Sequence, residues 1–324
     1  MTKFLVTGGC GFLGAAFIRH QFDSPHDADV VNYDCLSYAS RPERLAHLAT
    51  EPHYRFVKGD VADADGLRTL FNRAGPFDIV VHFAAETHVD RSLANAIPFV
   101  RSNVLGTQVL LDQFRNQQHG SFVHISTDEV YGPAPPGTCY KEDAAPHPKN
   151  PYSATKAASD HLVEAAVRSY GIDACVVRSV NVYGPSQFPE KFIPLAVTTL
   201  LSGGSIPLYG DGEQIRDWVF VDDYVRGVNV VIKSGSRGEI YHIANQDERT
   251  NRQVAESICA LCDVPVATGI TRVDDRPGHD RRYSLDASKL RGMGWTAEVD
   301  FGRGLRETVD YFRLHPGKPA PARS

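Results

Sequence analysis

The sequence contains little cysteine and no long apolar run. Six of its 324 residues are cysteines, a sparse content that is typical of reduced thiols rather than of a disulfide-stapled scaffold. No apolar stretch approaches the roughly 18–20 residues that a membrane span needs, so we expect no membrane partner. Met1-Thr2-Lys3 leads into a strand-like run without a signal segment. These features predict a cytoplasmic protein.

An excess of charge of either sign is also missing. Lys and Arg number 34 against 39 Asp and Glu, a net charge of −5, and nothing in this balance favours a nucleic-acid partner. With 42% apolar and 23% charged residues, the composition is globular and excludes wholesale disorder, collagen and coiled coils. The length indicates about two domains.

Clusters with metal-ligand spacing are lacking as well. The CxxC of Cys259 and Cys262 falls within Gln253–Asp263, whose apolar residues have helical spacing. Any helix places two thiols at this spacing near one face, so we interpret the pair as structural, with a redox role as the alternative. The remaining His and Cys residues lack the spacing of metal sites, and we expect no bound metal.

The first half of the chain alternates short apolar runs with amphipathic stretches. The expected strands are Lys3–Thr7, Val30–Asp34, Tyr54–Lys58, Ile79–Phe83, Ser121–Ser126 and Ala174–Ser179. The expected helices are Phe12–Phe22, Ala64–Ala74, Pro98–Gln118 and Tyr152–Tyr170. This rhythm predicts an α/β fold, a Rossmann-type doubly wound parallel sheet with helices on both faces. Such sheets bind ligands at the carboxyl ends of their strands.

After about residue 180 prolines and glycines break this rhythm. We expect a smaller, partly interleaved C-terminal lobe that binds the substrate, formed by residues 181–216 and 246–315. The first domain comprises residues 1–180 and about 217–245, and Asp217–Ser234 returns to it as a helix. The last residues, 316–324, are expected to be frayed.

Residues 4–14 read FLVTGGCGFLG, a strand that runs through a glycine-rich turn into a helix. Two glycine triplets fit the turn, beginning at Gly8 or at Gly9 and sharing Gly11 and Gly14. Glycines allow a tight turn and a close approach to a pyrophosphate, and the helix N-terminus offers N–H groups to phosphates. The predicted dinucleotide contacts here are Gly8, Gly11, Phe12, Leu13 and Gly14.

Further cofactor contacts are expected at the ends of the next strands. Asp34 ends the second strand 20 residues after Gly14, where a carboxylate accepts ribose hydroxyls and repels a 2′-phosphate, so we expect NAD; Arg41 slightly weakens this preference. Asp60-Val61 and Ala84-Ala85 follow the third and fourth strands. Asp60 either lies near the adenine or caps the next helix.

Two groups of residues carry the expected chemistry. Tyr152 and Lys156 are four residues apart at the start of a helix, so both lie on one face. A nearby ammonium favours the phenolate and lowers the pKa of a tyrosine, which suits removal of a hydroxyl proton. Asp128-Glu129 follows the fifth strand. One carboxyl group there can act as an acid and the other as a base, although the pair alone is also consistent with a polar strand end.

Together, TGxxGxxG and YxxxK resemble the extended short-chain dehydrogenase/reductase family of nucleotide-sugar enzymes. Over residues 3–315 the chain is most similar to its dTDP-glucose 4,6-dehydratase branch. The motifs that carry this resemblance are HFAAETHVDRS (82–92), STDEVYG (126–132), FPEKFIPL (188–195), YGDGEQIRDWVFVDD (209–223) and RPGHDRRYSLD (276–286).

The resemblance implies a role for each matching residue. Tyr152, supported by Lys156, removes the 4-hydroxyl proton while hydride leaves C4 for NAD, and Thr127 bonds the C4 oxygen. Glu129 then takes the C5 proton and Asp128 protonates the departing C6 hydroxyl. Hydride returns to C6, which gives a 4-keto-6-deoxy sugar nucleotide and regenerates NAD.

The resemblance also implies substrate contacts and a homodimer. The expected contacts are His88, Ser92, Thr127, Asn181, Glu190, Lys191, Arg216, Asn251, Arg276 and His279. Asn103 is expected to fix the surroundings of the cofactor, and the helices Pro98–Gln118 and Tyr152–Tyr170 are expected to form the dimer interface.

The chain departs from the family pattern at four places. Asn181-Val182 replaces two asparagines, Ser186 stands where tyrosine is common, Tyr38-Ala39-Ser40-Arg41 differs from the usual Tyr-Ala-Gly-Asn, and Cys10 replaces alanine. The changes at 182 and 186 leave the sugar and base open. The alternatives are a 4-epimerase, a decarboxylase or a dehydratase acting on another nucleotide sugar. A protein that only senses NAD or a sugar nucleotide would lack the reactive residues.

Overall fold

The computed structural model describes residues 1–23, 28–275 and 279–316. Within these ranges the largest sheet has seven strands in the order β10-β6-β5-β4-β1-β2-β3, and every neighbouring pair is parallel. The strands are β1 (Thr2–Thr7), β2 (Ala28–Asp34), β3 (Tyr54–Lys58), β4 (Ile79–His82), β5 (Ser121–Thr127), β6 (Ala174–Ser179) and β10 (Ile240–Ile243). The predicted parallel sheet is confirmed.

Helices cover both faces of this sheet, as the continuous apolar strands require. On one face, α1 (Phe12–Asp23) packs against α8 (Val221–Ser234). On the other, α5 (Gly106–Gln117) packs against α2 (Ala64–Ala74) and α6 (Pro151–Tyr170). The buried apolar residues accordingly form two clusters, one on each side of the strands.

Short helical segments connect the larger elements. They are η1 (Pro42–Leu48), α3 (Val89–Ala94), α4 (Ile97–Phe99), η2 (Val100–Leu105) and η3 (Asp128–Tyr131). The predicted helix Pro98–Gln118 is therefore three consecutive pieces, because η2 is a π-helix. Asn103 lies in this wider turn. Its side chain accepts a hydrogen bond from the backbone N–H of Glu86 and donates to the Glu86 carbonyl and to the Thr155 hydroxyl. π-Helical turns often occur at functional sites, and this one fixes the segment that follows β4.

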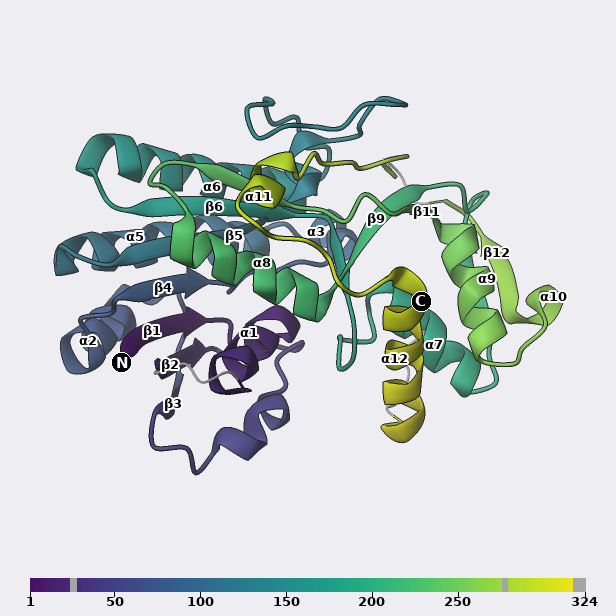
Figure 1. Ribbon diagram of the computed structural model, residues 1–324, viewed down its shortest axis with the longest axis horizontal. Coiled ribbons are helices and arrows are strands. Elements are labelled where there is room, and N and C mark those ends of the chain that lie inside the picture. The colour runs from purple at the N-terminus through teal and green to yellow at the C-terminus, as the bar shows by residue number, and fades with distance from the viewer. Residues whose placement is uncertain (24–27, 276–278, 317–324) are drawn as a thin grey trace.

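A second group of elements lies at the carboxyl ends of the strands, on the right of Figure 1. A three-stranded sheet has the order β11 (Glu248–Thr250), β9 (Ile215–Phe220), β7 (Asn181–Tyr183), and β8 (Ile206–Tyr209) pairs with β12 (Ile270–Val273). The helices of this group are α7 (Phe192–Leu201), α9 (Asn251–Leu261), α10 (Val266–Gly269) and α12 (Phe301–Leu314), while α11 (Ser288–Gly292) contacts β10.

The chain passes between the two groups more than once. It leaves the large sheet after β6, returns through α8 and β10, and leaves again into β11. The prediction of a helix over Asp217–Ser234 is wrong for its first four residues, which belong to β9. Those residues pair with β7 and β11, and Trp218 and Phe220 are buried. The helix begins at Val221.

In the described part of the chain, none of the helices has both the length and the apolar character needed to cross a bilayer.

Candidate active site

The glycine turn between β1 and α1 is built so tightly that side chains cannot enter it. Gly8 has a φ of +70°, and a Cβ there would lie 2.7 Å from the backbone of Ala84. A Cβ on Gly14 would lie 2.4 Å from the Gly8 carbonyl oxygen, and one on Gly9 would overlap the Asn32 side chain. The fit at Gly11 is looser, with the Gly8 oxygen at 3.0 Å. The turn therefore needs glycine at both candidate first positions.

Asp34 holds this turn from the end of β2. Its carboxylate accepts hydrogen bonds from the backbone N–H groups of Cys10 and Leu36, at 2.9 and 2.7 Å, and from the Ser40 hydroxyl. Arg41 donates to the carbonyls of Tyr38 and Ser40 in its own loop. The group next to the turn is thus a carboxylate, which disfavours a bound 2′-phosphate.

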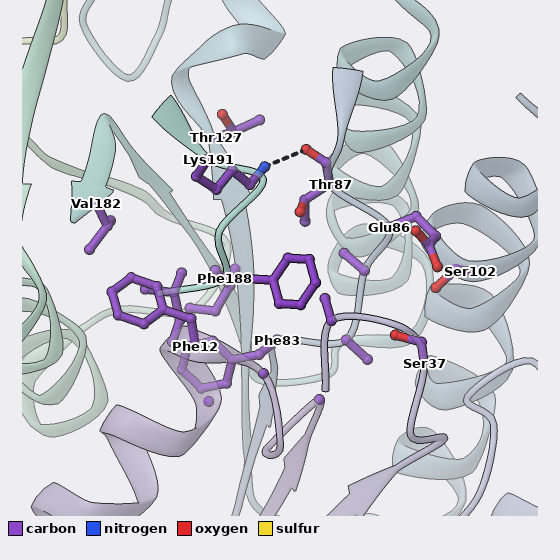
Figure 2. Close-up of a pocket in the computed structure, with 18 of the residues that line it drawn as sticks. Phe12, Ser37, Phe83, Glu86, Thr87, Ser102, Thr127, Val182, Phe188 and Lys191 are labelled. Carbon is purple, nitrogen blue, oxygen red and sulfur yellow. Dashed lines mark hydrogen bonds between the residues drawn. The ribbon is translucent and has the colours of Figure 1, made fainter. Parts of the chain in front are cut away.

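A single cavity of about 330 Å³ runs from the glycine turn to the ends of β5 and β7. Its apolar wall includes Phe12, Phe83 and Phe188 (Figure 2). Most of the predicted site residues line it: Gly8, Gly11, Phe12, Leu13, Gly14, Asp34, Asp60, Val61, Ala84, Ala85, Thr127, Asp128, Glu129, Tyr152, Lys156, Asn181, Glu190 and Lys191. Asp60 does not cap α2, whose N-cap is Asp63; it pairs with Arg101 at 2.8 Å.

Other predicted residues lie outside the cavity lining. His88 caps α3, and its Nε2 lies 3.9 Å from Glu190. Ser92 is buried; it accepts a hydrogen bond from the backbone N–H of Tyr152 and so holds the start of α6. Asn251 begins α9, and the Nδ1 of His279 lies 2.6 Å from Asp275. Arg276 lies outside the described residues.

The turn that follows β5 presents two carboxyl groups to the cavity. Thr127 donates to Asp128 Oδ1 at 3.1 Å and accepts from the backbone N–H of Glu129. Asp128 is buried, and its Oδ2 has no hydrogen-bond partner among the described residues. Burial and the neighbouring Glu129 raise the pKa of Asp128 to about 8. Asp128 therefore carries a proton at neutral pH and is suited to act as an acid.

Tyr152 and Lys156 lie on one face of α6 and are both buried. Burial and the Glu129 carboxylate raise the pKa of Tyr152, and the neighbouring Thr127 hydroxyl opposes this shift. Lys156 Nζ donates to the Ile125 carbonyl at 2.7 Å, and burial lowers its pKa to about 8. The pKa of Tyr152 is thus raised overall in this structure because burial dominates at the phenol, and the effect of Lys156 on that pKa stays a prediction.

A buried polar column that the sequence analysis missed lies beneath Lys156. His124 Nε2 is 3.3 Å from Lys156 Nζ and 3.5 Å from Asp160 Oδ1. Asp160 in turn accepts from Arg178 Nε at 2.8 Å. Burial alone would raise the pKa of Asp160, but the hydrogen bond from His124 and the charge of Arg178 lower it to about 2. The one feature of the sequence that could have revealed this column is a histidine, His124, within the apolar run of β5.

A loop from the second group of elements closes over the cavity. Lys191 Nζ donates to the Thr87 carbonyl at 2.8 Å (Figure 2). The Glu190 carboxylate accepts from the Tyr38 hydroxyl at 2.9 Å. Arg44, also missed, donates to the Cys10 carbonyl in the glycine turn and to the Ser186 carbonyl in this loop. The two halves of the cavity are therefore joined by direct hydrogen bonds.

Arg216, another predicted site residue, is buried in β9 and is not part of the cavity lining. It donates to the carbonyls of Ile215 and Asp280, and its guanidinium lies 4.4 Å from the centre of the Tyr283 ring. Its charge also reaches Asp128, where it partly opposes the rise in pKa. Across the described ranges, no group of three or more His, Cys, Asp and Glu side chains could hold a metal ion.

Comparison with known proteins places this site in a family. A family profile described as GDP-mannose 4,6 dehydratase matches residues 5–308. The dTDP-glucose 4,6-dehydratase 1 of Escherichia coli K12 is 43% identical over 335 residues, which cover 96% of this chain and 92% of that protein. The dTDP-glucose 4,6-dehydratase of Actinoplanes sp. is 45% identical over 319 residues, covering 97% and 98%. The chain belongs to the dTDP-glucose 4,6-dehydratase family.

Solved structures of the dTDP-glucose 4,6-dehydratase family have the same fold. The enzyme from Streptomyces venezuelae, crystallised with NAD and the ligand TYD, superimposes with a TM-score of 0.92 at 44% identity, and 97% of each chain is covered. The enzyme from Bacillus anthracis, in complex with NAD, gives a TM-score of 0.90 at 36% identity, again over 97% of each chain. A UDP-glucose 4-epimerase from Thermus thermophilus is more distant in sequence, with 29% identity and a TM-score of 0.89.

Proposed function

We propose that the protein is an NAD-dependent hydro-lyase that converts dTDP-glucose to dTDP-4-keto-6-deoxyglucose. The observation that carries this proposal is the placement of Asp128, Glu129 and Tyr152 around one end of the cavity, with Asp128 protonated. An elimination needs an acid and a base beside neighbouring atoms of one substrate. The family to which the chain belongs supports the choice of substrate.

The residues at the turn fit NAD. Gly8 and Gly11 line the cavity at the start of α1, where a pyrophosphate would bind, and Asp34 lines it at the end of β2, where a ribose would bind. Buried polar atoms of several cavity-lining residues, among them Ser126 Oγ and Trp218 Nε1, lack a hydrogen-bond partner among the described residues, which is typical of a surface that a polar ligand completes. When bound, NAD accepts hydride from C4 and returns it to C6.

The first proton transfer belongs to Tyr152. Its phenol takes the proton of the 4-hydroxyl group, and the neighbouring Thr127 hydroxyl hydrogen-bonds the oxygen that becomes a carbonyl. Lys156 supplies the positive charge beside the phenol. Since burial raises the pKa of Tyr152 in this structure, this charge and the bound cofactor are needed to form the phenolate.

The two carboxyl groups carry out the elimination. The 4-keto group acidifies the C5 proton, which Glu129 takes as the base. Asp128 gives its proton to the C6 hydroxyl, the C6–O bond breaks, and water leaves as the C5–C6 double bond forms. The proton on Glu129 returns to C5 when C6 is reduced, so no net oxidation occurs.

We assign the nucleotide to the second group of elements. The guanidinium of Arg216 suits a diphosphate, since arginine pairs with phosphates in a bidentate way. The remaining proposed contacts are His88, Ser92, Asn181, Glu190, Lys191, Asn251, Arg276 and His279. We also propose that residues 1–180 with α8 and β10 form the cofactor domain, and that the other elements form the substrate lobe.

Incubation with dTDP-glucose, followed by mass spectrometry of the product, tests this function. We expect the loss of one water with no net reduction of bound NAD. Glu129→Gln is expected to stop water loss while NAD still binds. A product of unchanged mass but inverted at C4 would favour an epimerase instead. An unchanged substrate would exclude dTDP-glucose, and other nucleoside diphosphate hexoses would then be tried.

We further propose a homodimer formed through α5 and α6. Apolar side chains are exposed in α3, α4 and η2, the segments that precede α5, at Leu93, Ile97, Val100 and Leu105, and Tyr170 is exposed at the end of α6. Sedimentation analysis should show a dimer, and Ile97→Asp should shift it toward monomer. A wild-type monomer would refute the interface.

All six cysteine thiols are free, which supports a reducing, cytoplasmic location.

A further inference from the structure

Asn150 joins the start of α6 to the turn that carries Glu129. It is the N-cap of α6: its Oδ1 accepts from the backbone N–H of Ser153 at 2.9 Å, and its own N–H donates to the Ser153 hydroxyl. The amide nitrogen of the same side chain donates to Glu129 Oε2 at 3.2 Å. The cap fixes the amide orientation, because a flipped amide would place N–H against N–H at Ser153 and oxygen against oxygen at Glu129.

Glu129 has a specific need for such a donor. It is half-buried at the cavity and lies beside other acidic groups: Asp128 from its own turn, Tyr152 from α6, and Tyr283 from the segment before α11. Asn150 offers a neutral N–H group to this carboxylate and so holds it without adding charge.

We propose that Asn150 is a positioning residue that binds one oxygen of the Glu129 carboxylate and directs its other oxygen at the proton to be removed. This inference rests on the proposed function of Glu129 as the base. It explains why an N-cap position, which a serine or an aspartate would fill equally well for the helix, holds an asparagine here.

Two substitutions separate the cap from the contact with Glu129. Asn150→Ser and Asn150→Asp both keep an oxygen that can cap α6, but neither donates an amide N–H to Glu129. Asn150→Ser should lower kcat by about tenfold, the effect of losing a hydrogen bond to a charged group, with KM nearly unchanged. Its kinetic isotope effect with C5-deuterated substrate should rise, since C5 deprotonation becomes slower. Asn150→Asp should lower kcat more strongly than Asn150→Ser, because it places a like charge beside the Glu129 carboxylate.

The N-cap of α2 offers a matched control, a helix cap that lies away from the cavity. Asp63 caps that helix through the backbone N–H groups of Asp65 and Gly66 and does not line the cavity. Asp63→Ser should leave both kcat and the isotope effect unchanged.

The isotope effect is a readout that the loss of a helix cap alone would not change. An unchanged isotope effect in folded Asn150→Ser would overturn the inference. A fall in melting temperature with an unchanged isotope effect would show that Asn150 only caps the helix, which also overturns it. A wild-type protein that releases no water from any nucleotide sugar would refute the proposed function instead.

Discussion

Replacing Asp128 by asparagine should lower kcat and should also change how the free energy of unfolding depends on pH. The carboxyl group has an ordinary pKa of 3.8 and reaches about 8 in the folded protein, first because of burial and then because of Glu129. At pH 7 about nine-tenths of it is protonated. The asparagine amide has nearly the same shape and keeps an oxygen to accept from Thr127, but it neither donates a proton to a leaving hydroxyl nor ionises.

The effect on stability follows from proton linkage. Between pH 3.8 and pH 8 the unfolded chain has released this proton and the folded chain has not. The contribution of Asp128 to the free energy of unfolding is therefore full below pH 3.8 and falls by about 1.4 kcal/mol for each pH unit as pH rises toward 8. From pH 5 to pH 7 the wild type should lose about 3 kcal/mol relative to Asp128→Asn, whose side chain does not titrate.

Urea unfolding of both proteins at pH 5, 6, 7 and 8 measures this difference directly. Asp128→Asn should also lower kcat by about 10²–10⁴-fold, the usual contribution of a general acid, and should abolish the loss of activity above about pH 8 that we expect of the wild type. Affinity for NAD should not change. If the difference in unfolding free energy is the same at pH 5 and pH 7, Asp128 ionises normally in the folded protein and its assignment as the acid fails.

Three further predictions concern the buried polar column beneath Lys156, the glycine turn after β1 and the phenol of Tyr152. Asp160→Asn leaves the buried Arg178 charge unpaired and should destabilise the protein by about 3–5 kcal/mol in urea unfolding. Because the pKa of Asp160 is lowered to about 2, the stabilisation that the wild type gains from the ionised Asp160 should be lost as pH falls from 3.8 toward 2. A change below 1 kcal/mol would show that the ion pair adds little. Gly8→Ala should weaken NAD binding at least tenfold in calorimetry, since its Cβ would lie 2.7 Å from the Ala84 backbone and left-handed backbone strain adds about 1–2 kcal/mol; wild-type affinity would refute the tight fit. Tyr152→Phe should lower kcat by at least about 100-fold while NAD binding persists, and near-normal turnover would remove Tyr152 from the mechanism.

Elements with strong local patterns could be predicted from the sequence. β3 and β6 have the expected bounds, as does α2, because each is a short run of regular periodicity between turn residues. The start of α8 was misplaced because residues 217–220 have no local signal for a strand: their structure is set by pairing with β7 and β11, which are distant in sequence. The strand β10 was missed for the same reason.

The site shows the same division between local and long-range information. Gly8 and Asp34 stand in a recognisable motif, and both line the cavity. The hydrogen bonds of Arg44 to Ser186 and of Tyr38 to Glu190 join residues 142 and 152 positions apart. Such contacts depend on how the two groups of elements dock, and neither residue type nor spacing reveals them in a single sequence.

The interleaving of the chain also determines when the large sheet becomes complete. Its edge strand β10 comes more than 60 residues after its neighbour β6, so a nascent or truncated chain ending near residue 180 exposes the apolar edge of β6, including Val176 and Val177. An unpaired apolar edge is a template for association with other chains. A fragment that holds only the glycine turn and the helix with Tyr152 is therefore expected to associate through this edge, which is not protected until the chain has been synthesised past residue 243.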